Sequence, residues 1–569
     1  MNILDLNNLT IEQNKLLNNI NVELKVDYHE LVQELYVKVD NNIFWYVNSL
    51  LSRNNFFSKV FTNLCYLELV KKISNEDHIS EVIVLNQVQK KILKDYFKKE
   101  KIEIIFNPNK KHQIKDILKP FYAFCLNFSF SFSSIISSSR KRRNKFIANE
   151  SEITLIDTFV TPFEFESGKY KSRHYPKKEL WDFLTQKDKE SVYFLPEIVG
   201  TISIRSIIKK LCVSDENYIF KNDFLKLSDY IKAVLSPILI KKINFDSFLF
   251  REFKIGPLLK SDYSMNISNG NSFKGILNFY FFKRAKELDV KFKLIVNWFE
   301  NQPLDKGFNF GVRTFYPNTK AIGFQPFLQD LNFSFHLCPT KLEEEKLVIP
   351  KLIVVIGEKY KKLIKTFYSD LNVTSGPSIR YKYLYNIDDD FLLLKKEYIL
   401  IALPISLKES RDIINLIAEV LENEKDLNYK KEWILKPHPD LKLSILEEEF
   451  KKIFNNFKVL NQPINELLKR SSLVITNGSS VAFEAIVLGI SVCIVGAQNG
   501  FTQNPIPSDI DAKIWQLCYT KNDLSQFLKK ISLYKESDRN QLIEIGKQIK
   551  DEYFEPVNLT TVRALLHLK

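Results

Sequence analysis

A glycine-serine turn between two apolar runs contains the residue types that most clearly indicate chemistry. The run 473–476 is followed by Asn477 and Gly478, and Ser479 and Ser480 then open a segment with apolar residues at helical spacing. Backbone N–H groups at a helix start are unpaired and carry partial positive charge, so a phosphate is well held there. Serine hydroxyls add donors, and glycine lets the backbone come close. The turn is a candidate phosphate site or, in the simpler interpretation, a serine N-cap.

A second candidate is a His-Pro turn that precedes the serine turn in the chain. The apolar burst 433–436 stops at Pro437, His438 and Pro439. If this burst forms a strand that neighbours the strand before the serine turn, His438 lies at the carboxyl edge of the same sheet. Ligands bind at that edge in open α/β folds. The prolines alone indicate only that a strand ends.

The residues around the serine turn also predict the architecture that positions it. A strand at 473–476, a helix that ends at Gly489 and a buried strand at 492–495 form a βαβ unit, and its crossover requires a parallel sheet. Strand, helix and strand follow one another in the same way over residues 81–106. The N-terminal half is therefore also expected to be α/β.

The motifs KPHP and NGSSVAFEA resemble the His-Pro and Ser-Ser motifs of bacterial GT-B transferases that use cytidine-activated donors. These include sialyl-, polysialyl- and Kdo transferases of capsule and lipopolysaccharide synthesis and, more distantly, CDP-glycerol polymerases of teichoic acid synthesis. The resemblance covers roughly the last third of the chain. It implies a nucleotide site made of His438, Pro439, Gly478, Ser479, Ser480 and Glu484. In that site His438 and the serines hold the donor phosphate, Glu484 reaches the ribose, and no metal or other cofactor is required.

The same resemblance implies an α/β fold of GT-B type, with two Rossmann-like domains and helical insertions in the N-terminal half. We expect an acceptor-binding domain over residues 1–345 and a nucleotide-sugar-binding domain over residues 346–540. A C-terminal helix over residues 541–569 is expected to cross back to the first domain. The boundary is placed near residue 345 because the apolar run 352–356 is expected to begin the second domain.

Several apolar runs of the N-terminal half end at or near a carboxylate, where α/β enzymes place working groups. The candidate catalytic bases, in order of preference, are Glu300, Asp157 and Glu197. Glu300 comes first because Asn301 and Gln302 follow it in a polar turn, and because partial burial beside Trp298 is expected to raise its pKa. The alternative, given equal weight, is that Glu300 caps the next helix or pairs with Arg313.

Composition narrows the class of protein. The chain has 569 residues, of which 45% are apolar and 26% charged, as in soluble proteins with more than one domain. It has no run of eighteen apolar residues, its start is not a signal peptide, and its six cysteines include no CxxC pair. These features predict a reduced, cytoplasmic protein without structural zinc. The net charge of +14 is spread along the chain, and no nucleic-acid-binding motif occurs, so no nucleic-acid partner is expected.

One stretch leaves two interpretations open. An aromatic, serine-rich segment at 121–132 leads into a basic cluster at 140–145. An apolar face beside a basic cluster can lie on an anionic membrane surface, which would give peripheral contact with the inner face of the cytoplasmic membrane. The preferred interpretation is a helical hairpin with a solvated basic end.

We therefore predict a glycosyltransferase that moves an acidic sugar, of nonulosonic acid or Kdo type, from CMP to a cell-surface glycan or glycolipid. His438 would stabilise the departing nucleotide, and Glu300 would accept the proton of the acceptor hydroxyl. One alternative keeps the architecture and changes the donor to CDP-glycerol or a UDP- or GDP-sugar. Another is a non-catalytic sugar-nucleotide-binding protein.

Overall fold

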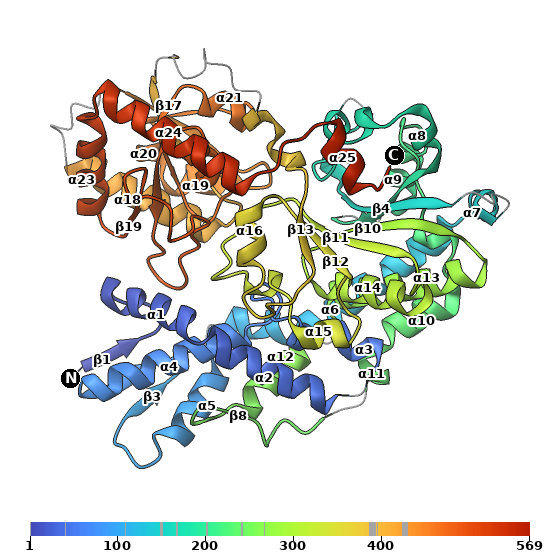
Figure 1. Ribbon diagram of the computed structural model, residues 1–569. Coiled ribbons are helices and arrows are strands. Elements are labelled where there is room, and N and C mark those ends of the chain that lie inside the picture. Colours follow the sequence, from blue (N-terminus) through green and yellow to red (C-terminus); the bar gives the residue numbers. More distant parts are fainter. Residues whose placement is uncertain are drawn as a thin grey trace.

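Two six-stranded parallel sheets form the body of the protein, and a three-stranded parallel sheet lies in an N-terminal lobe. Figure 1 shows the N-terminal lobe at the lower left, the first large sheet at the right and the C-terminal domain at the upper left. The computed structural model describes residues 2–39, 41–107, 110–147, 152–166, 169–200, 203–240, 243–266, 268–385, 394, 396–423 and 431–568.

The first large sheet has the strand order β13-β12-β11-β10-β4-β7. Its strands are β4 (Ile153–Val160), β7 (Val192–Ile198), β10 (Phe292–Trp298), β11 (Lys320–Gln325), β12 (Leu352–Val355) and β13 (Val373–Ser375). Helices α13 (Gly270–Glu287) and α14 (Pro303–Phe315) cover one face, against residues such as Leu155. Ile156 points to the other face, which is covered by the segment around Trp181 and by α25 (Leu559–Leu565). Both faces are buried, so the strands are almost continuously apolar.

The second large sheet has the order β16-β15-β14-β17-β18-β19. Its strands are β14 (Tyr398–Ala402), β15 (Glu432–Lys436), β16 (Phe457–Val459), β17 (Ser471–Thr476), β18 (Ser491–Val495) and β19 (Trp515–Cys518). Helices α18 (Leu407–Asn423) and α23 (Lys521–Ser532) pack on one face, and α22 (Val481–Val487) and α24 (Glu536–Tyr553) pack on the other. The predicted βαβ unit around the serine turn is confirmed as β17, α22 and β18, because β17 and β18 pair in parallel. The strand before the His-Pro turn is one place further away than expected, since β14 lies between β15 and β17.

The expected domain boundary near residue 345 is wrong. Strand β12, which was expected to open the second domain, pairs with β11 in the first sheet, and β13 follows it there. The chain enters the second sheet only at β14. A short buried apolar run is compatible with either sheet, because its pattern shows that it is covered on both faces and not which strand it pairs with.

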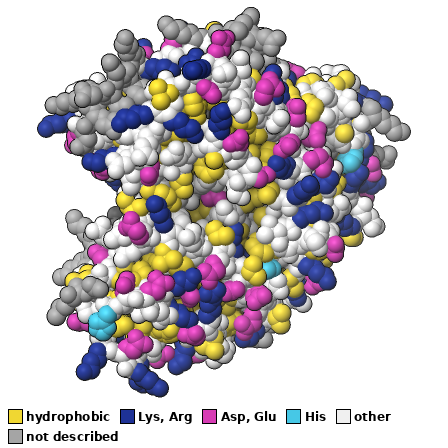
Figure 2. Space-filling model, turned by 60° about the vertical axis from the view of Figure 1, so that its left-hand side comes forward, with side chains coloured by type: hydrophobic (Ala, Val, Ile, Leu, Met, Phe, Trp, Pro, Cys, Tyr) yellow, Lys and Arg dark blue, Asp and Glu magenta, His cyan; other side chains and the backbone are white. Residues whose placement is uncertain are grey.

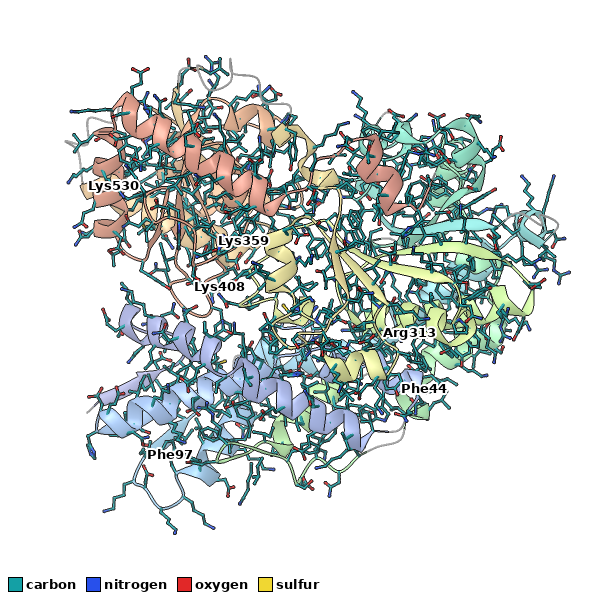
Figure 3. The ribbon with its side chains drawn as sticks, in the orientation of Figure 1. Phe44, Phe97, Arg313, Lys359, Lys408 and Lys530 are labelled. Carbon is teal, nitrogen blue, oxygen red and sulfur yellow. The ribbon has the colours of Figure 1, made fainter. Side chains whose placement is uncertain are left out.

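The C-terminal segment connects the two domains. Helix α24 packs on α22 of the second domain, and α25 contributes Val562 and Leu565 to the core of the first. Between these helices, the Glu555 N–H donates to the Ile356 carbonyl at 2.6 Å. Lys359, which lies on α16 (Glu358–Leu363), faces the second domain in Figure 3 and pairs at 2.7 Å with both Asp509 and Glu552.

The N-terminal lobe contacts both domains. It contains β1 (Asn2–Asp5), β2 (Ile79–Ile83), β3 (Glu103–Ile105), α1 (Ile11–Glu23), α2 (Lys25–Lys38), α4 (Val60–Glu76) and α5 (Gln87–Tyr96). Asn14 of α1 donates to the Ala497 carbonyl at 2.6 Å and accepts from the Gly500 N–H at 2.8 Å. Figure 2 shows this side of the molecule, where the surface is indented between the C-terminal domain above and the lobe below. The βαβ pattern predicted at 81–106 is confirmed as β2, α5 and β3, although these strands form a separate small sheet.

The remaining helices are insertions in the N-terminal half or short connections. They include α3 (Ile43–Tyr46), α6 (Lys110–Ile136), α7 (Arg140–Ile147), α8 (Gln186–Ser191), α9 (Ile204–Leu211), α10 (Leu227–Val234), α11 (Ser236–Leu239), α12 (Gly256–Asn266), α15 (Lys341–Glu345), α19 (Leu443–Glu449), α20 (Lys451–Phe454) and α21 (Ile464–Leu468). Two short hairpins are β5 (Phe165–Glu166) with β6 (Lys169–Tyr170), and β8 (Leu249–Phe250) with β9 (Phe253–Lys254).

Within the described residues, no helix is both long and apolar enough to span a bilayer. The predicted fold class is confirmed: the protein is α/β, with two Rossmann-like domains and helical insertions in the N-terminal half.

Candidate functional site

The carboxyl ends of the two large sheets meet at the junction between the domains. Arg173, in the segment that joins β4 to β7, lies 3.5 Å from the carboxylate of Asp440, which follows β15. Tyr383, which follows β13, donates its hydroxyl proton to Glu484, which follows β17. Each contact joins a segment after a strand of one sheet to a segment after a strand of the other. This is the edge at which open α/β sheets bind ligands.

His438 lies half-buried in the turn after β15, followed by the exposed Pro439. Its Nδ1 accepts a hydrogen bond from the Asp440 N–H at 3.1 Å. The proton of the neutral ring is therefore assigned to Nε2, which leaves Nε2–H as a donor. Burial lowers the pKa of His438, although the Asp440 carboxylate acts in the opposite direction. The side chain is thus a neutral hydrogen-bond donor near pH 7.

The serine turn is tightly constrained. Gly478 has φ +57, a conformation that favours glycine, and its N–H donates to the Gln503 carbonyl at 3.0 Å. Ser479 Oγ accepts from the Val481 N–H at 3.3 Å. Ser480 does not cap the helix with its side chain and instead donates to Glu484 Oε1 at 2.9 Å. Ser480 therefore occupies the N-cap position, as in the simpler interpretation, although its hydroxyl serves Glu484 and not the helix backbone. Ser479 and Ser480 are both half-buried.

Glu484 lies in a closed network. It is 6% exposed, and its two carboxylate oxygens accept from Ser480 and Tyr383. The expected contact between Glu484 and a ribose would require Tyr383 to move, because Tyr383 belongs to η7 (Ile379–Tyr385) of the opposite domain and covers the carboxylate. The sequence spacing correctly places Glu484 one turn into the helix, but it does not indicate that Tyr383 contacts the carboxylate.

Glu300 follows β10 and is half-buried. Its Oε1 accepts from Trp298 Nε1 at 2.9 Å, and the side-chain amide of Gln302 donates to its Oε2. Burial raises the pKa of Glu300, as expected from its neighbours, while the charge of Arg380 acts against that rise. A carboxylate with a raised pKa is better matched to proton transfer near neutral pH.

The two structural alternatives for Glu300, capping of the next helix and pairing with Arg313, are both wrong. The N-cap of α14 is Gln302, and the carboxylate that completes the cap is Asp305, which accepts from the Gln302 N–H at 3.0 Å. Asp305 also accepts from the Glu300 N–H at 3.1 Å. Arg313 donates to the Ile349 carbonyl. The Glu300 side chain is therefore free of both structural roles.

The other two candidate bases lie in different environments. Asp157 is buried and accepts from the Trp298 N–H and from Asn297 Nδ2, the latter at 2.7 Å. Burial raises the pKa of Asp157 to about 7. Glu197 is also buried, and burial opposes its ionisation, but Lys221 and Lys274 outweigh burial and lower its pKa. Glu197 is thus held as an ionised partner of two lysines, which makes it a poor proton acceptor.

Three further residues belong to the site although the sequence analysis did not select them. The ring of His174 stands edge-on to Trp298, with centroids 4.4 Å apart. Burial lowers the pKa of His174 to about 3, with further contributions from Arg380 and Arg173. Arg380 therefore lies near both His174 and Glu300, and Arg173 near both His174 and His438. His174 and Arg173 lie in an irregular segment and Arg380 in the short helix η7, so hydrophobic periodicity could not indicate them. The run SIRYKYLYN, which combines cations and tyrosines, was the one available signal.

No protein-family model matches the chain, and no curated protein matches it. Among solved structures, a UDP complex of S. aureus MnaA is 11% identical with a TM-score of 0.41, and the match covers 73% of this chain and 98% of that one. Acinetobacter baumannii MurG is 10% identical with a TM-score of 0.39, covering 73% and 98%. The wall teichoic acid polymerase TagF with CDPG is 12% identical with a TM-score of 0.37, covering 81% and 97%. TM-scores below 0.5 do not establish a shared fold, and the two-domain fold follows from the sheet topology itself.

Proposed function

We propose that the protein is a glycosyltransferase that moves an acidic sugar, of nonulosonic acid or Kdo type, from CMP to a cell-surface glycan or glycolipid. One observation carries the proposal: polar residues from the carboxyl ends of two parallel sheets meet at one junction. The second domain contributes His438 and the serine turn, and the first contributes Glu300. The choice of cytidine and of an acidic sugar is supported by the resemblance of KPHP and NGSSVAFEA to cytidine-dependent transferases.

The second domain would hold the nucleotide. The neutral His438 ring would donate its Nε2–H to the donor phosphate, and Ser479 would donate its hydroxyl proton. The Ser480 hydroxyl, which donates to Glu484, would have to turn from that carboxylate toward the phosphate. As the bond from the sugar to the phosphate breaks, negative charge grows on the departing nucleotide. A fixed donor aimed at growing charge contributes roughly 2.7–4 kcal/mol in comparable oxyanion sites.

The first domain would activate the acceptor. Glu300 is the group that takes the proton of the acceptor hydroxyl as the new bond to the sugar forms, because its pKa is raised and it has no structural partner that requires its charge. Arg380 supplies positive charge near Glu300, and Arg173 supplies it near His174 and His438. A guanidinium pairs well with a carboxylate or a phosphate, and an acidic sugar presents the first while its donor presents the second.

A thermal-shift panel of CMP, CDP, UDP and GDP tests the donor class. We expect CMP and CDP to raise the melting temperature most, and we expect His438→Ala to remove most of that rise. Larger shifts with UDP or GDP would indicate that the donor is a uridine or guanosine nucleotide and not a cytidine nucleotide. No shift with any nucleotide would contradict a nucleotide site at this junction.

A further inference from the structure

Helix α6 presents an apolar face to solvent. Six large apolar side chains on it are between 53% and 66% exposed: Leu118, Phe121, Tyr122, Phe128, Phe132 and Ile136. They recur mainly at steps of three, four and seven residues and therefore share one side of the helix. The opposite side is buried, because Asn127 donates to the Ser268 carbonyl at 3.0 Å and Phe130 packs on Phe273. The outward face is thus apolar although the helix is firmly seated on the domain.

Neighbouring helices extend this surface. Helix α10, which packs against α6, and α11 after it expose Leu227, Ile231, Ile238 and Leu239. Figure 1 shows α10 and α13 below the first sheet, on the side away from the C-terminal domain. Large exposed apolar surfaces are uncommon on monomeric proteins and mark sites of interaction.

A basic helix follows directly. In α7, Arg142 pairs with Asp223, with Nη2 and Oδ1 2.7 Å apart. Arg140, Lys141 and Lys145 are exposed, and among the described residues no carboxylate pairs with them. Exposed aromatic and aliphatic side chains next to unpaired cations are the features of a surface that lies on an anionic bilayer.

We propose that the outward face of α6, extended by α10 and α11 and flanked by α7, docks on an anionic lipid surface. We name it the α6 face. The apolar side chains would enter the boundary between headgroups and acyl chains, while the cations of α7 contact the headgroups. A second copy of the chain fits less well, because each copy carries a net charge of +14 and the patch has a basic margin. The proposal is independent of the transferase chemistry, and lipid binding can be measured without a donor or acceptor.

Vesicle co-sedimentation of the full-length protein tests the proposal. We expect binding to an equimolar mixture of phosphatidylcholine and phosphatidylglycerol at low salt, little binding to phosphatidylcholine alone, and weakening as salt is raised. Phe121→Ser/Phe132→Ser should lower the partition coefficient by about tenfold or more. Arg140→Glu/Lys141→Glu should lower it by about 25-fold or more, since each cation near the surface contributes about fivefold.

Matched controls separate the α6 face from general charge and hydrophobicity. Leu533→Ser removes a side chain that is 78% exposed elsewhere. Lys521→Glu/Lys530→Glu reverses two charges on α23, and Figure 3 shows Lys530 on the C-terminal domain, far from α7. Both controls should bind vesicles like the wild type. As a measurement without any variant, hydrogen exchange of residues 118–136 in the wild-type protein should slow when anionic vesicles are added.

Three results would overturn the proposal. The first is an absence of binding to anionic vesicles at low salt, together with unchanged exchange in α6. The second is wild-type binding by both α6-face variants, with circular dichroism showing that they are folded. The third is a dimer in solution that Phe121→Ser/Phe132→Ser disperses while vesicle binding is unaffected, which would make the α6 face a contact between two copies.

Discussion

Two clusters of charged residues, one between the lobe and the first domain and one at the domain junction, contain similar side chains in opposite electrostatic states. In the first, Glu343 accepts from Arg53 Nη2 at 2.9 Å and from Lys306 Nζ at 2.5 Å, and all three side chains are at most 1% exposed. Burial opposes ionisation of Glu343, but the two cations outweigh it and lower the pKa of the carboxyl to about 2. The cluster is charged, closed and fixed.

At the junction, Glu300 has the opposite character. Its pKa is raised, and within the part of the chain that the structure describes it has no ion-pair partner. Arg380 is near and exposed. Buried charges that are paired hold a structure together, whereas a carboxylate without an ion-pair partner is available for proton transfer. The residue types are similar in the two clusters, and only the ion-pair partners of each carboxylate distinguish them.

The largest effect is expected for Glu300→Gln. Glutamine keeps the size of the side chain and an oxygen that can accept from Trp298 Nε1, but it cannot take a proton. Turnover should fall by about 10²–10⁴-fold, the usual contribution of a general base, while the free energy of unfolding stays nearly constant. Asp157→Asn is the matched control. Near-normal turnover in Glu300→Gln together with a loss in Asp157→Asn would move the role of base to Asp157.

At the buried cluster, a substitution is expected to lower the stability of the fold. Glu343→Gln leaves Arg53 and Lys306 buried without a negative partner, which should lower the free energy of unfolding by about 3–5 kcal/mol in denaturant titrations. Glu345→Gln, on the same helix but exposed, should change it by about 0.5 kcal/mol or less. If both variants had equal stability, the buried cluster would not have the structural role assigned to it.

Asp157 offers a pH-dependent comparison. Its folded pKa of about 7 lies above the reference value of 3.8, so between these values the folded state holds a proton that the unfolded state lacks. That proton contributes to the free energy of unfolding at low pH. The contribution is lost as pH rises from about 4 to about 7, by up to about 1.4 kcal/mol per pH unit. Asp157→Asn should therefore flatten the fall in unfolding free energy between pH 4 and pH 7. An unchanged slope would show that other groups cause it.

A smaller effect is expected at the serine turn. Gly478→Ala places a Cβ at φ +57, where it would lie 3.0 Å from the Cβ of Gln503. The strain should cost about 1–2 kcal/mol and shift the turn, so nucleotide affinity should fall with it. Gly376→Ala, at a glycine without positive φ, is a control for loss of stability without a change at the turn. Unaltered affinity in Gly478→Ala would argue against a phosphate at this turn.

The sequence predicted the parts of this protein that follow from local pattern. The βαβ unit around Gly478 and the raised pKa of Glu300 were predicted because hydrophobic period and immediate neighbours determine them. The assignment of β12 to the first sheet could not be predicted, since strand pairing depends on contacts between distant segments. For the same reason, the sequence analysis did not predict that Tyr383 contacts Glu484, or that Lys221 and Lys274 pair with Glu197.

A crystal structure of the protein grown with CMP tests the central claim most directly. The account predicts the nucleotide at the carboxyl edge of the second sheet, with its phosphate hydrogen-bonded to His438 Nε2 and next to Ser479 and Ser480, and with Glu300 facing it from the other domain. A nucleotide bound to the first sheet, or away from both the His-Pro turn and the serine turn, would contradict the account.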